Sequence, residues 1–308
     1  MTTLPHDDIR IGTMAGGQTA PAFIEQAGHH GFESYQINFW TKLGDTPLPR
    51  LAERVKAACA GVAEGLGFEP TVSSVCPFGN PLQEPEHARM WESCIDAAGA
   101  FGCGVVCGFA GALEDRPVDE NMDRFKEVFG PLVERAADRG VRLAFENCDM
   151  GGTWERPKWN IAHAPRAWEM MFDALGNPDN LGLLWEPCHQ MVSLIDPLPQ
   201  LRDWIDKVFL VHGKDASIDW DLLRHQGLRS GRGFVKHRTP GFGDTNWTDV
   251  ISTLRRGGFR GSIDIEGWHD PVYRERLEMT GQVHALRYLQ RCRGGEFIPN
   301  PPVMDEAD

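Results

Sequence analysis

Four side chains with the chemistry of metal ligands stand at the ends of apolar runs in the second half of the sequence. They are Glu146 in "RLAFEN", Glu186 in "LGLLWEP", His212 in "VFLVHGKD" and Glu266 in "SIDIEG". Three carboxylates held close together would repel one another strongly unless a cation lay among them. Carboxylate oxygens with a single imidazole form a hard ligand set that suits one divalent ion. We therefore expect a metal site, with Mn²⁺ as the first choice and Mg²⁺, Co²⁺, Fe²⁺ or Zn²⁺ as alternatives.

The elements that carry these residues alternate between short β-rich runs and amphipathic helical stretches. The sequence contains eight such runs, at residues 8–14, 33–39, 70–75, 104–110, 142–147, 181–186, 208–215 and 262–267. Eight strands with helices between them can close into a single (β/α)8 TIM barrel, predicted over residues 1–295, with 296–308 as a Pro-rich, acidic tail. The carboxyl ends of neighbouring barrel strands meet at one mouth, so the four candidate ligands are expected to converge there.

Two connections are longer than a barrel needs, and both follow the carboxyl end of a predicted strand. They run from Cys148 to about Ala164 and from Ala216 to about Trp247. Long loops inside compact domains are usually functional, so we expect a substrate lid, with Trp154 as a substrate contact. The tryptophans near strand ends and mouth loops either stack on a sugar ring or an aromatic substituent, or only pack the lid. They are Trp40, Trp154, Trp159 and Trp268.

The stretch "GLLWEPCHQ" places an imidazole three residues after a carboxylate. Pro187 keeps Glu186 extended, so its carboxylate is expected to point out of the strand end rather than into a following helix. His189 either contacts the substrate or packs locally. Cys188 has no evident base partner and lies among acidic residues, which disfavour a thiolate, so it is not a candidate nucleophile.

Composition and charge narrow the class of protein. A formal net charge of −13 would repel a phosphate backbone, which argues against a nucleic-acid partner. The eight cysteines are scattered without C-x-x-C spacing, so we expect reduced thiols and no cysteine metal site. The N-terminus lacks the basic and apolar regions of a signal peptide, and no apolar stretch is long enough for a membrane span. These features predict a cytoplasmic protein, and the sequence leaves open whether it forms a homo-oligomer.

Five short motifs occur in order along the second half of the chain: "LAFEN", "WEPCH", "VHGKD", "TPGFGDTNW" and "DIEGWHD". Their order and placement at strand ends resemble the xylose isomerase-like barrels, a superfamily that includes ketose 3-epimerases, inosose dehydratases and endonuclease IV. In its ketose 3-epimerases a Glu, an Asp, a His and a second Glu bind the metal, and the resemblance places these roles on Glu146, Glu186, His212 and Glu266. Glu186 departs from the usual Asp and is one methylene longer. His189 matches a histidine that contacts substrate in relatives.

The resemblance also covers the segment from Arg238 to Asp244, whose arginine reaches substrate oxygens in the family. It implies that Arg238 binds substrate. Lys214 and His237 are further candidates for substrate binding in the same mouth, with a plain surface role as the alternative for His237. The early strands show no obvious set of extra ligands for the three-zinc cluster of endonuclease IV.

The ligand set suggests one reaction class. A divalent cation bound to sugar oxygens polarises a carbonyl and acidifies the neighbouring C–H bond, so that a carboxylate removes the proton and an enediolate results. With Glu146 and Glu266 as the catalytic acid and base, the sequence predicts a metal-dependent isomerase or epimerase acting on a carbohydrate or cyclitol. Elimination from a keto-sugar, an inosose or a 3-keto-glycoside, which would make the protein a lyase, is the alternative. A non-enzymatic carbohydrate-binding barrel is the third hypothesis.

Overall fold

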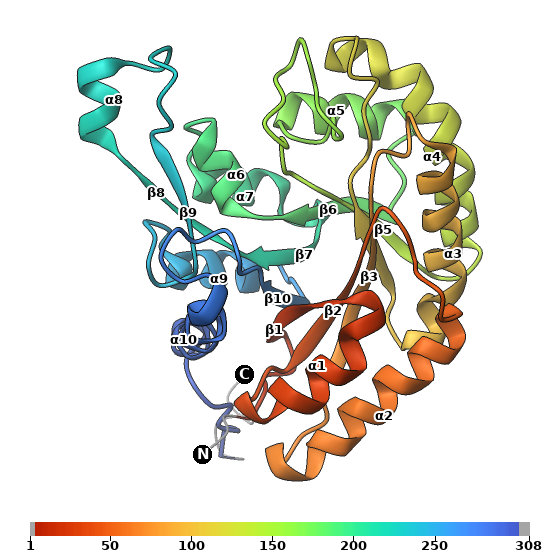
Figure 1. The fold of residues 1–308 in the computed structure, drawn as a ribbon, viewed down its shortest axis with the longest axis vertical. Coiled ribbons are helices and arrows are strands. Elements are labelled where there is room, and N and C mark those ends of the chain that lie inside the picture. The colour runs from red at the N-terminus through yellow and green to blue at the C-terminus, as the bar shows by residue number, and fades with distance from the viewer. Residues whose placement is uncertain (1–3, 302–308) are drawn as a thin grey trace.

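A ring of parallel strands forms the centre of the molecule (Figure 1). The computed structural model describes residues 4–301. Eight strands close the barrel in the order β1-β10-β7-β6-β5-β4-β3-β2, and every neighbouring pair is parallel. They are β1 (Ile9–Gly16), β2 (Ser34–Trp40), β3 (Thr71–Phe78), β4 (Val105–Gly108), β5 (Arg142–Glu146), β6 (Leu181–Trp185), β7 (Val208–Gly213) and β10 (Gly261–Ile265). The predicted (β/α)8 barrel is confirmed, with each strand at one of the eight predicted runs.

Helices surround the barrel and connect successive strands (Figure 1). The main ones are α1 (Ala20–Ala27), α2 (Leu48–Leu66), α3 (Pro85–Phe101), α4 (Met122–Ala137), α5 (Pro165–Ala174), α7 (Pro197–Trp204), α9 (Trp247–Arg256) and α10 (Glu278–Arg293). Short 3-10 turns occur at Gly17–Thr19, Gly28–His30, Val118–Asn121, Ile205–Lys207 and Glu275–Leu277. Many of the helices carry a proline in the first turn, where its missing N–H is not needed. Among the described residues, no helix combines the length and apolar character that crossing a bilayer requires.

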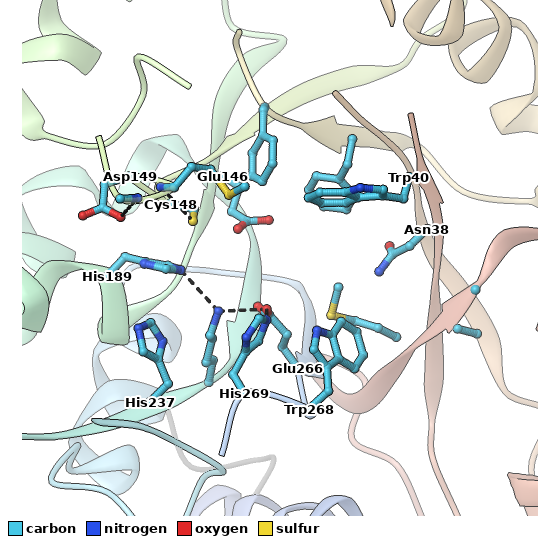
Figure 2. A pocket seen from close by; sticks show the side chains of 18 residues that line it. Asn38, Trp40, Glu146, Cys148, Asp149, His189, His237, Glu266, Trp268 and His269 are labelled. Carbon is cyan, nitrogen blue, oxygen red and sulfur yellow. Dashed lines mark hydrogen bonds and ion pairs between the residues drawn. The ribbon is translucent and has the colours of Figure 1, made fainter. Parts of the chain in front are cut away.

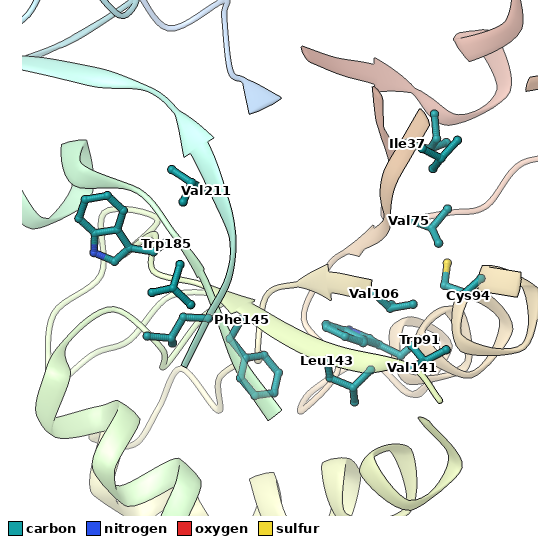
Figure 3. Close-up of a cluster of buried hydrophobic side chains, with 14 of the residues drawn as sticks. Ile37, Val75, Trp91, Cys94, Val106, Val141, Leu143, Phe145, Trp185 and Val211 are labelled. Atoms are coloured by element: carbon teal, nitrogen blue, oxygen red, sulfur yellow. The ribbon is translucent and has the colours of Figure 1, made fainter. Parts of the chain in front are cut away.

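The core between barrel and helices fixes the strand ends that carry the site. Phe145, the residue before Glu146, packs outward against Phe129 of α4 and Trp91 of α3, with ring centroids 4.8 and 5.9 Å away (Figure 3). All three aromatic side chains are buried. Because side chains alternate along a strand, anchoring Phe145 among the helices directs Glu146 into the barrel.

The barrel interior below the mouth is polar and crowded. Asp264 accepts hydrogen bonds from Ser34 Oγ (2.7 Å) and Ser73 Oγ (2.6 Å), and burial raises the pKa of this carboxyl to about 6. Gly12 lies against this group: a Cβ there would stand 2.1 Å from Ser34 Oγ and 2.2 Å from Asp264 Oδ1. Only a residue without a side chain fits at this point of β1.

Two excursions extend from the carboxyl ends of the strands. The connection from Cys148 to Ala164 contains only isolated bridges and is tied to β5 by Asn160, whose side chain donates to the Glu146 and Cys148 carbonyls. The second excursion is more ordered than the sequence suggested. It forms an antiparallel hairpin, β8 (Asp215–Ile218) and β9 (Val235–Arg238), with helix α8 (Trp220–Gln226) standing out from the barrel (Figure 1).

The predicted C-terminal tail is only partly described. Residues 296–301 form no helix or strand and are exposed, and residues 302–308 lie outside the described part of the chain. The barrel is closed at its opposite end by a buried ion pair between Glu33 and Arg293, which ties the β2 end of the ring to α10.

Candidate metal centre and active site

The four predicted metal ligands lie together at the mouth of the barrel. Strands β5 and β7 and the residues directly after β6 and β10 each supply one side chain, and ligand atoms of all four lie within 4.8 Å of one another. His212 Nδ1 is 3.6 Å from Glu146 Oε2, 3.4 Å from Glu186 Oε2 and 3.3 Å from Glu266 Oε2. All four side chains are buried. The structure thus brings together residues that are up to 120 positions apart in the sequence, from Glu146 to Glu266.

Three of the converging atoms make no hydrogen bond to any of the described residues. Glu186 Oε2, His212 Nδ1 and Glu266 Oε2 are buried and accept or donate no hydrogen bond there. Leaving buried polar atoms unsatisfied costs free energy, and native proteins rarely do so without a bound group. Carboxylate oxygens and an imidazole nitrogen aimed at one point are the donors that a divalent cation takes. The residues present therefore fit the divalent ion that the sequence suggested.

Burial and neighbouring charges separate the protonation behaviour of the acids. Burial raises the pKa of Glu146 to about 7, against the opposing charge of His212 and with a contribution from Glu266. Burial would also raise the pKa of Glu266, but the Lys214 ammonium and His212 hold it well below its ordinary value. Without a bound cation, Glu266 thus carries the negative charge while Glu146 exchanges a proton near neutral pH.

Lys214 is the buried cation of this cluster. Its Nζ donates to Glu266 Oε1 at 2.8 Å and lies 3.9 Å from Glu186 Oε1. Burial lowers the pKa of this amine, but Glu266, Cys188, Cys148 and Glu146 together outweigh that effect, and the pKa is raised above its ordinary value. The ammonium therefore stays charged and partly balances the three carboxylates.

The backbone changes from strand to helix at Glu186, which explains why the Glu186 carboxylate and the His189 imidazole lie only three residues apart at the mouth. Glu186 is extended (φ −142°, ψ 141°), as Pro187 predicted. A short helix, α6 (Pro187–Val192), begins directly after Glu186, with the proline in its first turn. Asn147 fixes the position: its side chain accepts from Glu186 N (2.8 Å) and donates to Glu186 O (2.9 Å).

His212 contacts a residue from the other side of the barrel. The side-chain amide of Gln36 on β2 lies 2.8 Å from His212 Nε2. A histidine that binds a metal through Nδ1 carries its proton on Nε2 and needs an acceptor there. The Gln36 amide offers an oxygen for this bond when its terminal group is turned. No sequence signal marks this residue, because a glutamine inside an early strand has no distinctive spacing to the ligands.

The predicted substrate-binding residues divide into two groups. His189, Lys214 and His237 line the cavity at the mouth. His189 Nε2 lies 3.2 Å from Lys214 Nζ and is also in contact with Glu186. Burial and the nearby Lys214 charge lower the pKa of His189 well below its ordinary value and that of His237 to about 4, so both rings are neutral at neutral pH.

Arg238 and Trp154 do not line this cavity. Arg238 Nε donates to the buried Asp270 at 3.0 Å, which turns the guanidinium toward the loop after β10. Trp154 Nε1 donates to Asp119 at 3.1 Å, and the ring packs under the Arg166 guanidinium. Both predicted substrate contacts are thus engaged elsewhere by acidic partners that the sequence did not single out.

The cavity itself has a volume of about 710 Å³, and two of the four candidate ligands, Glu146 and Glu266, line it (Figure 2). Sequence reasoning missed several of its lining residues, namely Asn38, Phe78, Phe109, Cys148 and His269. His269 Nε2 lies 3.0 Å from Glu266 Oε1, and its position in "DIEGWHD" was the available signal. The phenylalanines could not be recognised, because an aromatic residue in a strand is most often core.

Comparison with known proteins agrees with the barrel and its sequence motifs. A family model described as "Xylose isomerase-like TIM barrel" matches residues 24–292. Inosose dehydratase of Lactiplantibacillus plantarum is 26% identical over 187 residues, a match that spans 59% of this chain and 58% of the relative. Other curated relatives that carry the same name match 37% of this chain at 29–30% identity.

Solved structures share the fold at low sequence identity. The 3-keto-D-glucoside 4-epimerase of E. coli superposes with a TM-score of 0.65 at 15% identity, covering 92% of this chain and all of that one. The IOLI protein, described with a binding zinc atom, has a TM-score of 0.65 at 16% identity and covers 92% of this chain and 98% of its own. Because the family match extends over most of its length, the chain belongs to the xylose isomerase-like TIM barrel family.

Proposed function

We propose that this protein is a divalent-metal-dependent enzyme that moves a proton on a carbon next to the carbonyl of a sugar or cyclitol, as an isomerase or epimerase. The main support for this proposal is the cluster of Glu146, Glu186, His212 and Glu266. Three buried ligand atoms of this cluster lie close together and make no hydrogen bond to the described residues. Mn²⁺ is the proposed ion because it accepts both carboxylate oxygen and imidazole nitrogen, with Mg²⁺, Co²⁺, Fe²⁺ and Zn²⁺ as alternatives. The zinc described for the IOLI neighbour supports the same type of site.

When bound, the cation would polarise the substrate carbonyl and make the neighbouring C–H bond more acidic. Glu146 and Glu266 come from β5 and β10, which stand apart in the ring with β6 and β7 between them. In the proposed mechanism one carboxylate removes the proton and the other returns one. The pKa of Glu146, raised by burial to about 7, suits a group that gives and takes protons near neutral pH.

Lys214 and His189 have complementary tasks in this proposal. The permanently charged Lys214 is a poor proton donor, but it can donate a hydrogen bond to an oxygen on which negative charge develops. His189 is neutral, and its Nδ1 is buried without a partner in the described chain. That nitrogen can bond a substrate hydroxyl and fix which carbon faces Glu146.

A lyase is the second candidate, favoured by the curated relatives named inosose dehydratase. The first step is the same removal of a proton beside the carbonyl. If a hydroxyl or an alkoxy group stands on the next carbon, the electron pair of the broken C–H bond forms a C=C bond. The leaving oxygen then departs with a proton as water or an alcohol.

We also propose a cytoplasmic location, on the ground that all eight cysteines carry free thiols.

The test joins metal content to isotope exchange. Purified wild type, the double variant Glu146→Gln/His212→Asn and the control Glu53→Gln, an exposed glutamate on α2, are loaded with Mn²⁺, dialysed and analysed for bound metal. D-fructose, a keto-inositol and methyl 3-keto-β-D-glucopyranoside are then incubated with each protein in D2O and followed by NMR. We expect one ion per chain and solvent deuterium beside the carbonyl for wild type and Glu53→Gln only.

The products discriminate the two reactions. Deuterated epimer or isomer supports the first candidate, and loss of water or methanol with a new double bond supports the lyase. Absence of a bound ion in the wild type, after Mn²⁺ loading, would refute both.

A further inference from the structure

The cavity is chemically divided into two halves. The carboxyl end of β5 and the segments that follow β6, β7 and β10 supply its ionisable residues, among them Glu146, His189, Lys214 and Glu266. The ends of β1 to β4 supply Met14, Trp40, Phe78 and Phe109, together with the small residues Ala15 and Gly16. Figure 2 shows the two halves facing one another, with Trp40 on one side of Asn38 and Trp268 on the other.

Trp40, Phe78 and Phe109 form a concave aromatic wall. The Phe78 and Phe109 rings meet edge to face at 4.9 Å, and Trp40 stands perpendicular to Phe109 at 6.1 Å. Trp159 stacks on Trp40 at 5.5 Å with an angle of 23° between the rings. Although packed by these neighbours, Trp40 keeps 54% of its surface exposed. The wall therefore presents exposed apolar surface to the cavity, and covering it with an apolar ligand would be favourable.

The backbone holds two tryptophans of this region in an unfavourable conformation. Trp159 has φ 61° and Trp268 has φ 46°, a left-handed region that bulky residues rarely adopt. Each backbone amide donates to a carboxylate: Trp159 N to Glu114 Oε1 (3.2 Å) and Trp268 N to Glu278 Oε2 (2.8 Å). Trp268 is nevertheless 48% exposed, so burial of its ring does not explain why the chain holds it there. Strained residues with dedicated supports concentrate where a ligand binds.

From this geometry we propose that the apolar half of the cavity binds a flat, apolar group attached to the sugar. The substrate class would then be sugars that carry an aromatic or similarly flat substituent, rather than free monosaccharides. This inference rests on the proposed function, because the polar half must hold the sugar carbonyl. A volume of about 710 Å³ also falls in the range of roughly 300–1,000 Å³ that takes drug-sized ligands.

Binding of an unsubstituted sugar against the aromatic wall would be unfavourable. Sugars carry hydroxyls around the whole ring, and each hydroxyl buried against Trp40, Phe78 or Phe109 would exchange a hydrogen bond to water for none. Among the lining residues that the ends of β1 to β4 supply, Asn38 is the one with a polar side chain, and its Oδ1 is buried without a hydrogen-bond partner in the described residues. It can accept from one hydroxyl, at the boundary where a sugar would end and a flat substituent begin.

Calorimetric binding of two inert glucosides tests the proposal. Phenyl β-D-glucopyranoside and methyl β-D-glucopyranoside lack the carbonyl that the reaction needs, so neither is consumed. With Mn²⁺-loaded wild type we expect the phenyl glucoside to bind at least 10-fold more tightly. Trp40→Ala and Trp268→Ala should each reduce this preference at least 3-fold. The matched control is Trp220→Ala, because that tryptophan on α8 is 47% exposed and does not line the cavity; the preference should be unchanged.

Metal content of the same samples separates the two proposals. If Mn²⁺ is bound and the two glucosides bind equally, or neither binds, the inference about the substituent is overturned while the proposed function stands. If no metal binds, the proposed function fails, whatever the glucosides do. A preference for the phenyl glucoside that survives both Trp40→Ala and Trp268→Ala would also overturn the inference, because neither exposed tryptophan of the cavity would be its source.

Discussion

The buried ion pair at the closed end of the barrel gives the sharpest prediction for stability. Both guanidinium ends of Arg293 donate to the Glu33 carboxylate, Nη2 to Oε1 at 2.8 Å, and Nη1 also donates to the Ile9 carbonyl at 2.8 Å. Gln290 Nε2 (3.0 Å) and Ile11 N (2.8 Å) complete the shell around the carboxylate. Neither charged side chain is exposed. The pair joins the residue before β2 to the end of α10, and both side chains also bond the backbone of β1, the strand that pairs with β10 to close the ring.

Replacing Arg293 by Met removes one charge and leaves the other buried. Breaking a buried pair in this way costs about 3–5 kcal/mol of unfolding free energy, mostly because the remaining ion is uncompensated. Two amide donors still reach Glu33, which favours the lower end of that range. With a shift of about 2–4 °C per kcal/mol in a chain of this size, Tm should fall by roughly 6–15 °C.

Urea unfolding followed by circular dichroism measures the loss. The control is Arg135→Met, because Arg135 pairs with Asp96 on the surface and an exposed pair contributes about 1 kcal/mol or less. The double variant Glu33→Gln/Arg293→Met should recover part of the loss, since no buried charge remains. A loss for Arg293→Met no larger than that for Arg135→Met would refute the reasoning.

Three further predictions concern the mouth and the barrel interior. Burial raises the folded pKa of Glu146 to about 7, and its carboxylate together with Glu266 raises that of His212, so both groups bind protons more tightly when folded. Relative to Glu146→Gln, metal-free wild type should therefore lose stability, on the order of 3 kcal/mol, as pH rises from about 5 to 8, and Mn²⁺ should offset this loss in wild type. The comparison with the variant cancels the contributions of His189 and His237, whose lowered pKa values act in the opposite direction. Tm of both proteins against pH in the presence of a chelator checks this, and a difference that stays constant with pH would contradict it. Gln36→Leu leaves His212 Nε2 without its partner and should weaken Mn²⁺ binding about 10–100-fold in calorimetry, whereas unchanged affinity would mean that Gln36 does not orient the ring. Gly12→Ala forces a methyl group against Asp264 and should cost about 1–3 kcal/mol or prevent folding, while Gly61→Ala, in open space on α2, should be neutral or slightly stabilising; equal Tm values for the two variants would show that the interior can relax.

Much of the fold follows from local pattern. The alternation of apolar runs with amphipathic segments placed all eight barrel strands, because strands and helices differ in the periodicity of their buried residues. Once a parallel barrel is accepted, residues at the carboxyl ends of its strands must share one mouth. The convergence of Glu146, Glu186, His212 and Glu266 could therefore be predicted from their positions in the sequence.

The orientation of individual side chains could not be predicted in this way. Arg238 and Trp154 are residue types that bind sugars, and both lie in loops that follow barrel strands. Their side chains nevertheless donate hydrogen bonds to Asp270 and Asp119 and do not line the cavity. Pro187 signalled the extended backbone of Glu186 correctly, but it also begins a helix, because a proline serves equally well as a strand end and as a first helical residue.

The sequence by itself determined the barrel and the ionisable half of its mouth, because both follow from residue type and strand position. Only the tertiary structure shows which residues form the apolar half of the cavity. Phe78 and Phe109 resemble ordinary core residues in the sequence, and Gln36 has no motif around it. For Trp40 the sequence left open whether the ring stacks on a substrate or packs a lid. These residues acquire a role only when ring closure sets the ends of β1 to β4 opposite those of β5 to β10. Contacts between residues so far apart depend on the whole barrel, and no local pattern encodes them.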